Sequence, residues 1–203
     1  ADDAAGQFAA VVLADTEDTW NSIFRKMNKQ YTDPTLVLFS EATASGCGFA
    51  HQATGPFYCP ADSKVYVDLS FFEEMKTRLN ASGDFAQAYV IAHEVGHHVQ
   101  HLLGITNQVD AQRGRLSETD MNRLSVKLEL QADFLAGVWA HYQALKKDPA
   151  LKSEFEAKKA SDKAFASDSW AMLTFIFQRS AWYEKGHLRY PVGRIIGTEQ
   201  MHK

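Results

Sequence analysis

Two histidines and a glutamate lie at a spacing that suits a metal site. His93 and His97 are four residues apart, and Glu94 follows the first of them. On a helix, residues four apart lie one turn apart on the same face, so both imidazoles can reach one ion. Glu94 lies too far round the helix to be a natural third ligand, but its carboxylate can deprotonate a metal-activated water. The pattern predicts His93 and His97 as zinc ligands and Glu94 as a catalytic base.

A catalytic zinc ion needs a third protein ligand and an open position. Gln100 and Leu103 stand where a metzincin would have Gly and His, which excludes that class. Cys47 is a candidate ligand in a deformylase-like site, although that site has Asp where this chain has Gly96. Glu129 fits better, because it is a carboxylate in an apolar surround on a second predicted helix. A buried ion pair between Glu129 and a nearby basic residue is the alternative interpretation.

The residues around Glu129 and after His97 suggest supporting roles. Asp133 lies one helical turn beyond Glu129, where it can accept a hydrogen bond from the outer nitrogen of a ligand histidine and fix its tautomer. Small residues such as Ala132 leave room for the two helices to approach closely. For His98 and His101 we expect surface or supporting roles rather than metal ligation.

The elements that carry these residues can be predicted from sequence periodicity. Apolar residues at three- and four-residue spacing predict a helix over residues 84–103. A capping box starts a longer helix over residues 117–147. Strand-forming runs at residues 35–39 and 64–69 are bounded by turn residues. We therefore predict an α+β fold, mostly helical with a small mixed or antiparallel sheet, as a single domain over residues 1–203.

Composition and charge exclude some classes of function. The formal net charge is -4, with both signs interspersed, so no basic stripe exists for nucleic acid. The longest apolar run, near residues 170–177, is far shorter than the roughly 20 residues that a membrane-spanning helix needs. The chain begins at Ala1 without a methionine, which fits removal of a signal peptide or a membrane anchor upstream.

The two cysteines of the chain lie close together in sequence. Cys47 and Cys59 share a segment rich in Gly, Pro and small polar residues. A loop of this size can close as a disulfide, and we predict that it does; two reduced thiols are the alternative. A disulfide would suit an oxidising compartment.

Several motifs of the chain resemble those of the bacterial neutral zinc metallopeptidases. The resemblance covers roughly residues 5–145, and the C-terminal helical region departs from it. Its most specific parts are residues 16–20, 55–62, 67–71, 84–87, 93–100 and 123–133.

The resemblance implies a zincin-like fold and a peptidase. Glu129 would be the third ligand of one Zn²⁺ per chain, and Glu94 the general base in the hydrolysis of a peptide or protein substrate. The strand near residues 65–69 would be the sheet edge that pairs with the substrate. Such proteins are exported in bacteria, to the periplasmic or extracellular face, and often anchored by one N-terminal transmembrane helix.

Two other functions are compatible with the same residues. One is a zinc-stabilised peptide-binding module without catalysis, and the other is a small-molecule metallohydrolase. Glu94 argues against the first, because a structural zinc site needs no base beside the ion. Candidates for binding the developing oxyanion are Tyr183, His187 and Tyr190.

Overall fold

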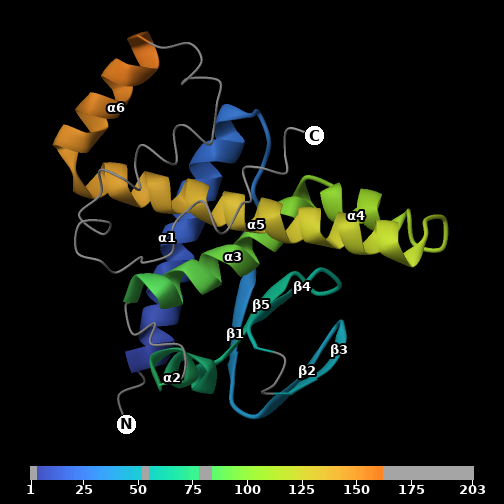
Figure 1. Cartoon of the computed structure of the whole chain (residues 1–203). Helices are drawn as coiled ribbons and strands as arrows, with labels where there is room; N and C mark the ends of the chain where they lie inside the picture. The colour runs from blue at the N-terminus through green and yellow to red at the C-terminus, as the bar shows by residue number, and fades with distance from the viewer. Residues whose placement is uncertain (1–3, 52–54, 78–83, 162–203) are drawn as a thin grey trace. The chain divides into compact units, whose positions relative to one another are not determined.

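The structure is a computed structural model that describes residues 4–51, 55–77 and 84–161 (Figure 1). The chain divides into two compact units, residues 1–139 and 140–203. The single domain expected over the whole chain stays a prediction. In chain order the described elements are α1 (Ala4–Lys26), β1 (Thr35–Phe39), β2 (Ala42–Ser45), β3 (Gly48–His51), β4 (Phe57–Cys59), β5 (Lys64–Asp68), α2 (Leu69–Thr77), α3 (Asp84–Leu102), α4 (Ile105–Asp110), α5 (Glu118–Lys147) and α6 (Pro149–Ser161).

The first unit contains a mixed three-stranded sheet and a separate hairpin. The strand order is β1-β5-β4, with β1 parallel and β4 antiparallel to β5, while β2 and β3 pair with each other. This confirms the predicted α+β class with a small mixed sheet. The expectation that residues 65–69 form the open sheet edge is wrong, because β5 is hydrogen-bonded on both sides.

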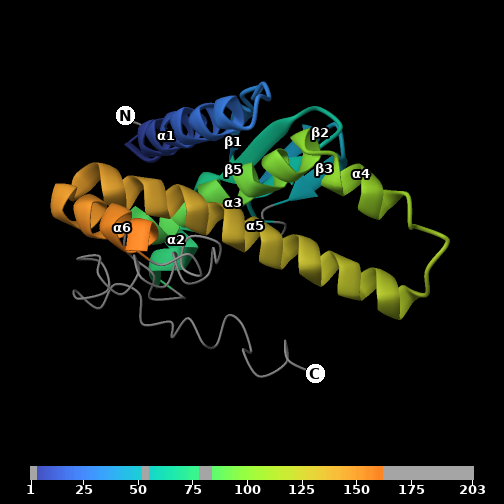
Figure 2. The ribbon, with the colours of Figure 1, turned by 90° about the horizontal axis from the view of Figure 1, so that it is seen from above.

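Helix α3 positions the metal motif, because one of its faces is locked into the core. Ile91, Val95 and Val99 recur every fourth residue and are fully buried. The helix contacts α1 and strands β4 and β5 (Figures 1 and 2). Residues two positions from this stripe, among them His93 and His97, point roughly to the opposite side of the helix. Burial of the apolar stripe therefore fixes the direction of the histidines.

Sequence signals mark the start of α5 and the end of α3, the two helices that carry the candidate site residues. Ser117 caps α5: its Oγ accepts a hydrogen bond from the main-chain N–H of Asp120 at 3.1 Å and donates to the Asp120 carboxylate at 2.8 Å. Helix α3 ends two residues before Gly104, whose φ of 75° lies in the left-handed region that glycine tolerates best. The predicted bounds of both helices agree with the structure to within one residue.

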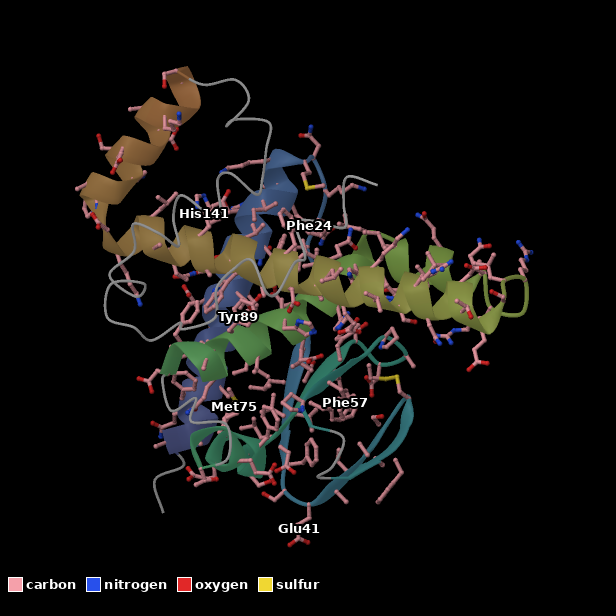
Figure 3. The ribbon with its side chains drawn as sticks, viewed as in Figure 1. Phe24, Glu41, Phe57, Met75, Tyr89 and His141 are labelled. Atoms are coloured by element: carbon pink, nitrogen blue, oxygen red, sulfur yellow. A yellow bond between two sulfur atoms is a disulfide. The ribbon has the colours of Figure 1, made fainter. Side chains whose placement is uncertain are left out.

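A disulfide fastens the β2–β3 hairpin to β4. Cys47 and Cys59 are bonded, as the sequence predicts, and the bond is visible between the hairpin turn and β4 in Figure 3. Asp62 adds a second tie, because its carboxylate accepts hydrogen bonds from the main-chain N–H of Gly46 at 2.9 Å and from the Tyr66 hydroxyl at 2.6 Å. The turn of the hairpin is thus held against the turn between β4 and β5.

Some expectations fall on residues that the structure does not describe. These are the oxyanion candidates Tyr183, His187 and Tyr190. Within residues 4–51, 55–77 and 84–161, no helix combines the length and the apolar character needed to cross a membrane.

Candidate metal centre

His93 and His97 stand side by side on α3 at the surface of the first unit. Their ring centroids are 4.9 Å apart, and their side chains are 20% and 21% exposed. They are therefore shielded by protein on most sides but still reachable by an ion from solvent.

Helix α5 brings Glu129 to the two histidines. Glu129 Oε2 lies 3.3 Å from Nε2 of His93 and 3.4 Å from Nε2 of His97. Two ligands of a tetrahedral zinc ion, each bonded at about 2.1 Å, lie about 3.4 Å apart. One ligand atom from each residue falls within 4.8 Å of the others. The two distances from Glu129 Oε2 therefore match the spacing expected between ligands of a zinc ion, and the three residues form a candidate metal site.

The structure does not support a buried ion pair of Glu129 or metal ligation by Cys47. The Glu129 side chain is 61% exposed, so it forms no buried ion pair. Arg123, one of the basic residues nearby in sequence, instead donates to Asp120 at 3.0 Å. Cys47 is bonded to Cys59 and has no thiolate to offer a metal. A deformylase-like site is thereby excluded.

The outer nitrogen of each histidine meets a hydrogen-bond partner. Asp133 Oδ1 lies 2.9 Å from Nδ1 of His93, and Gln100 Oε1 lies 2.9 Å from Nδ1 of His97. The part of Asp133 in metal binding stays a prediction. Gln100 was missed from the sequence, where it served only to exclude the metzincins. The available signal was its position three residues after His97, on the same helix face.

Helices α3 and α5 are held close together at this point. A Cβ atom built on Gly96 would lie 2.9 Å from the carbonyl oxygen of Ala132, which is too close for a larger residue. Next to this contact, the Tyr89 hydroxyl donates to the carbonyl oxygen of Asp133 at 3.0 Å (Tyr89 is labelled in Figure 3). The small residue sets the distance between the helices, and the hydrogen bond helps to set their register.

Glu94 is nearly buried beside the three candidate ligands, with 8% of its surface exposed. Burial raises its pKa to about 7, and the nearby charge of Glu129 adds to the increase. His93 and a hydrogen bond from the main chain of Tyr58 oppose this shift. Burial alone would lower the pKa of His93, but the Asp133 hydrogen bond and the surrounding carboxylates raise it. The charges of His93 and Glu94 thus favour one another, while burial keeps the pKa of Glu94 above its ordinary value.

His98 has a structural role. It is fully buried, and its Nε2 donates to the carbonyl oxygen of Thr32 at 2.6 Å. Its Nδ1 then accepts from the Tyr58 hydroxyl at 2.9 Å. Burial lowers the pKa of His98, which favours this neutral form. His98 thereby joins α3 to β4 and to the segment before β1, and neither of its nitrogens is free for a metal.

Comparison with known proteins identifies the family of the chain. Residues 1–187 match the family described as "Putative neutral zinc metallopeptidase", and the chain belongs to this family. The match extends beyond the residues 5–145 that the motifs cover. Within this family, the group of His93, His97 and Glu129 is a candidate metal site.

Two bacterial relatives illustrate the similarity. The chain is 56% identical over 140 residues to "Uncharacterized protein YpfJ" of Escherichia coli, covering 69% of this chain and 49% of that protein. It is 41% identical over 139 residues to "Uncharacterized protein Rv2575" of Mycobacterium tuberculosis, covering 68% of this chain and 46% of that protein. The chain thus spans about half the length of these relatives. No solved structure matches it.

Proposed function

We propose that this chain is a zinc-dependent peptidase that binds one Zn²⁺ through His93, His97 and Glu129. The observation that carries the proposal is the convergence of two Nε2 atoms and one carboxylate oxygen at 3.3 and 3.4 Å. These three residues would hold the ion, and three protein ligands are the number typical of catalytic rather than structural zinc sites. Membership in a zinc metallopeptidase family supports the same assignment.

Glu94 is the residue proposed to move protons. When bound, zinc supplies a Lewis acid that polarises the scissile carbonyl group and lowers the pKa of water. Glu94 accepts a proton from the attacking water and passes it to the leaving amine. Glu94 is nearly buried and follows His93 directly in the sequence, which places its carboxylate beside the proposed ligands and away from bulk water. The main-chain N–H of Tyr58 orients this carboxylate.

The substrate is proposed to be an extended peptide or protein segment. Strand β4 lies at the edge of the three-stranded sheet and contacts α3. Tyr58, at the centre of β4, hydrogen-bonds Glu94 through its main chain. An extended peptide that adds to the free edge of β4 would therefore run past the catalytic base. This replaces β5, which is paired on both sides, as the candidate substrate-binding strand.

An exported location on the periplasmic or extracellular face of a bacterial cell completes the proposal. The Cys47–Cys59 disulfide supports it, because disulfides persist in oxidising compartments. A membrane anchor upstream of residue 1 is also proposed, on the family resemblance alone.

One set of variants tests the proposed function. We expect the purified chain to bind one zinc ion and to cleave members of a mixed peptide library. Glu94→Gln should keep the zinc and lose roughly 10²- to 10⁴-fold in cleavage rate. Glu129→Ala should lose zinc and cleavage together. The control His101→Ala changes a histidine one turn beyond His97 and should keep both properties.

The outcomes separate the proposed peptidase from its rivals. Zinc binding without cleavage of any peptide would contradict the peptidase and favour a zinc-stabilised peptide-binding module. Cleavage confined to small esters or amides would favour a small-molecule metallohydrolase. Full zinc binding by Glu129→Ala would remove Glu129 from the ligand set.

A further inference from the structure

The side chain of Gln100 connects two of the proposed zinc ligands that lie on different helices. We propose that Gln100 is a positioning residue: it sets the tautomer of His97 and holds the turn of α5 that carries Glu129. This inference deepens the proposed function and rests on it, because His97 and Glu129 are the groups being positioned. Gln100 is only 1% exposed, so water cannot replace its contacts.

The direction of the Gln100 amide follows from its partners. Its Nε2 lies 2.8 Å from the carbonyl oxygen of Leu128, which can only accept a hydrogen bond. The NH₂ group must therefore face α5, and Oε1 faces Nδ1 of His97 at 2.9 Å. An amide oxygen is also only an acceptor, so Nδ1 of His97 must carry a hydrogen. In the neutral ring the lone pair then lies on Nε2, the atom 3.4 Å from Glu129 Oε2.

The same amide group acts on the helix that carries Glu129. Besides Leu128, Nε2 of Gln100 donates to Oε1 of Gln131 at 3.0 Å. Leu128 and Gln131 lie on the same turn of α5 as Glu129. Leu128 directly precedes Glu129, and Gln131 follows it by two residues. One buried side chain thus fixes the His97 ring and the turn of Glu129 relative to each other.

The two ligand histidines are supported by groups of different charge. Behind His93 stands the carboxylate of Asp133, whereas a neutral amide stands behind His97. A neutral amide orients the ring without adding negative charge to a site that already contains Glu94 and Glu129. The role of Gln100 is therefore geometric, and its loss should act on ring orientation and on the separation of the ligands.

The tautomer is measured in the metal-free protein, independently of zinc. In ¹⁵N NMR spectra at alkaline pH, where the ring is neutral, we expect His97 to carry its hydrogen on Nδ1. The signal is assigned by its loss in His97→Asn. In Gln100→Met the ring should shift towards the Nε2–H form that free histidine favours. Gln131→Met is the matched control, because it keeps the contacts of Gln100 with His97 and Leu128. The His97 tautomer in this variant should be unchanged.

Zinc affinity is measured by chelator competition on the same proteins. Gln100→Met should weaken it roughly 10- to 100-fold, and Gln131→Met should have a smaller effect. Gln100→Glu keeps an acceptor for His97 but loses the donors to α5, so it should keep the tautomer while losing affinity. If Gln100→Met does not fold, Gln100→Glu still tests the contact with α5, because zinc affinity equal to that of the unmodified chain would overturn the role of Gln100.

The results separate this inference from the proposed function. A His97 ring with Nδ1–H in Gln100→Met, or zinc affinity equal to that of the unmodified chain, would overturn the role of Gln100. An unmodified chain that shows the Nδ1–H tautomer but binds no zinc would instead refute the metal centre, while the tautomer assignment would stand.

Discussion

Replacing Gly96 by alanine tests how closely α3 and α5 approach at the metal centre. The added Cβ would lie 2.9 Å from the carbonyl oxygen of Ala132 and 3.2 Å from its Cα. Both are backbone atoms, so no side-chain rotation relieves the contact. In an unconstrained helix, Gly→Ala stabilises by roughly 0.5–1 kcal/mol, whereas overpacking a tight contact costs about 1–3 kcal/mol. We expect the second effect to win, with a net destabilisation of about 1–2 kcal/mol.

The change should also weaken zinc binding, because the helices must separate by a few tenths of an ångström and carry Glu129 away from the histidines. Urea unfolding of the metal-free protein and chelator competition measure the two effects. Asn122→Ala, at an exposed position of α5, is the control and should change neither. Adding Ala132→Gly should not restore Gly96→Ala, since the contacts are with the main chain of Ala132. A Gly96→Ala protein that is more stable than its parent would refute the close packing.

Three further predictions address the surroundings of the site. Asp133→Ala should weaken zinc affinity in chelator competition roughly 10- to 100-fold and leave the fold intact, because it removes the acceptor of the His93 hydrogen bond; unchanged affinity would exclude Asp133 from the site. In the folded metal-free protein the pKa of Glu94 is about 7, against an ordinary value of 4.5. The protonated Glu94 side chain therefore contributes to the free energy of unfolding in full below pH 4.5, and this contribution is lost as the pH rises through 7. The pKa difference corresponds to about 3 kcal/mol. In urea unfolding, the stability of Glu94→Gln should therefore depend less on pH than that of the parent protein, and an identical pH dependence would contradict the raised pKa. Reducing the Cys47–Cys59 disulfide should raise KM more than it weakens zinc binding, because it releases the hairpin from β4, and an equal loss of both would contradict this.

The parts of the fold that the sequence predicts are those with a strong local period. Helix α3 carries an apolar stripe, α5 begins at a capping box, and β1 and β5 are runs rich in β-branched and aromatic residues between turns. The hairpin β2–β3 and strand β4 were not predicted as strands, because strands of three or four residues show almost no alternation. Which strand forms the edge depends on the pairing of β1 with β5, and pairing between distant segments leaves no local signal in the sequence.

The same limit explains what was found and missed at the site. His93 and His97 are a local pair, so their spacing alone brings them together. Glu129 could be proposed because its chemistry and apolar surround are unusual on a helix. Gln100 was missed, because its position three residues after His97 was the available signal and nothing in its residue type marks it as functional. Its importance arises from burial against α5, which only the tertiary structure provides.

The two glutamates at the site differ in environment in a way that supports their proposed roles. Glu94 is 8% exposed and its pKa is raised to about 7, whereas the Glu129 side chain is 61% exposed. A proton carrier must exchange its proton near neutral pH, which burial promotes. A carboxylate ligand must be reachable by an ion from solvent, which the exposure of Glu129 allows. The buried face of α3 and the exposed turn of α5 therefore divide the two tasks between residues of the same type.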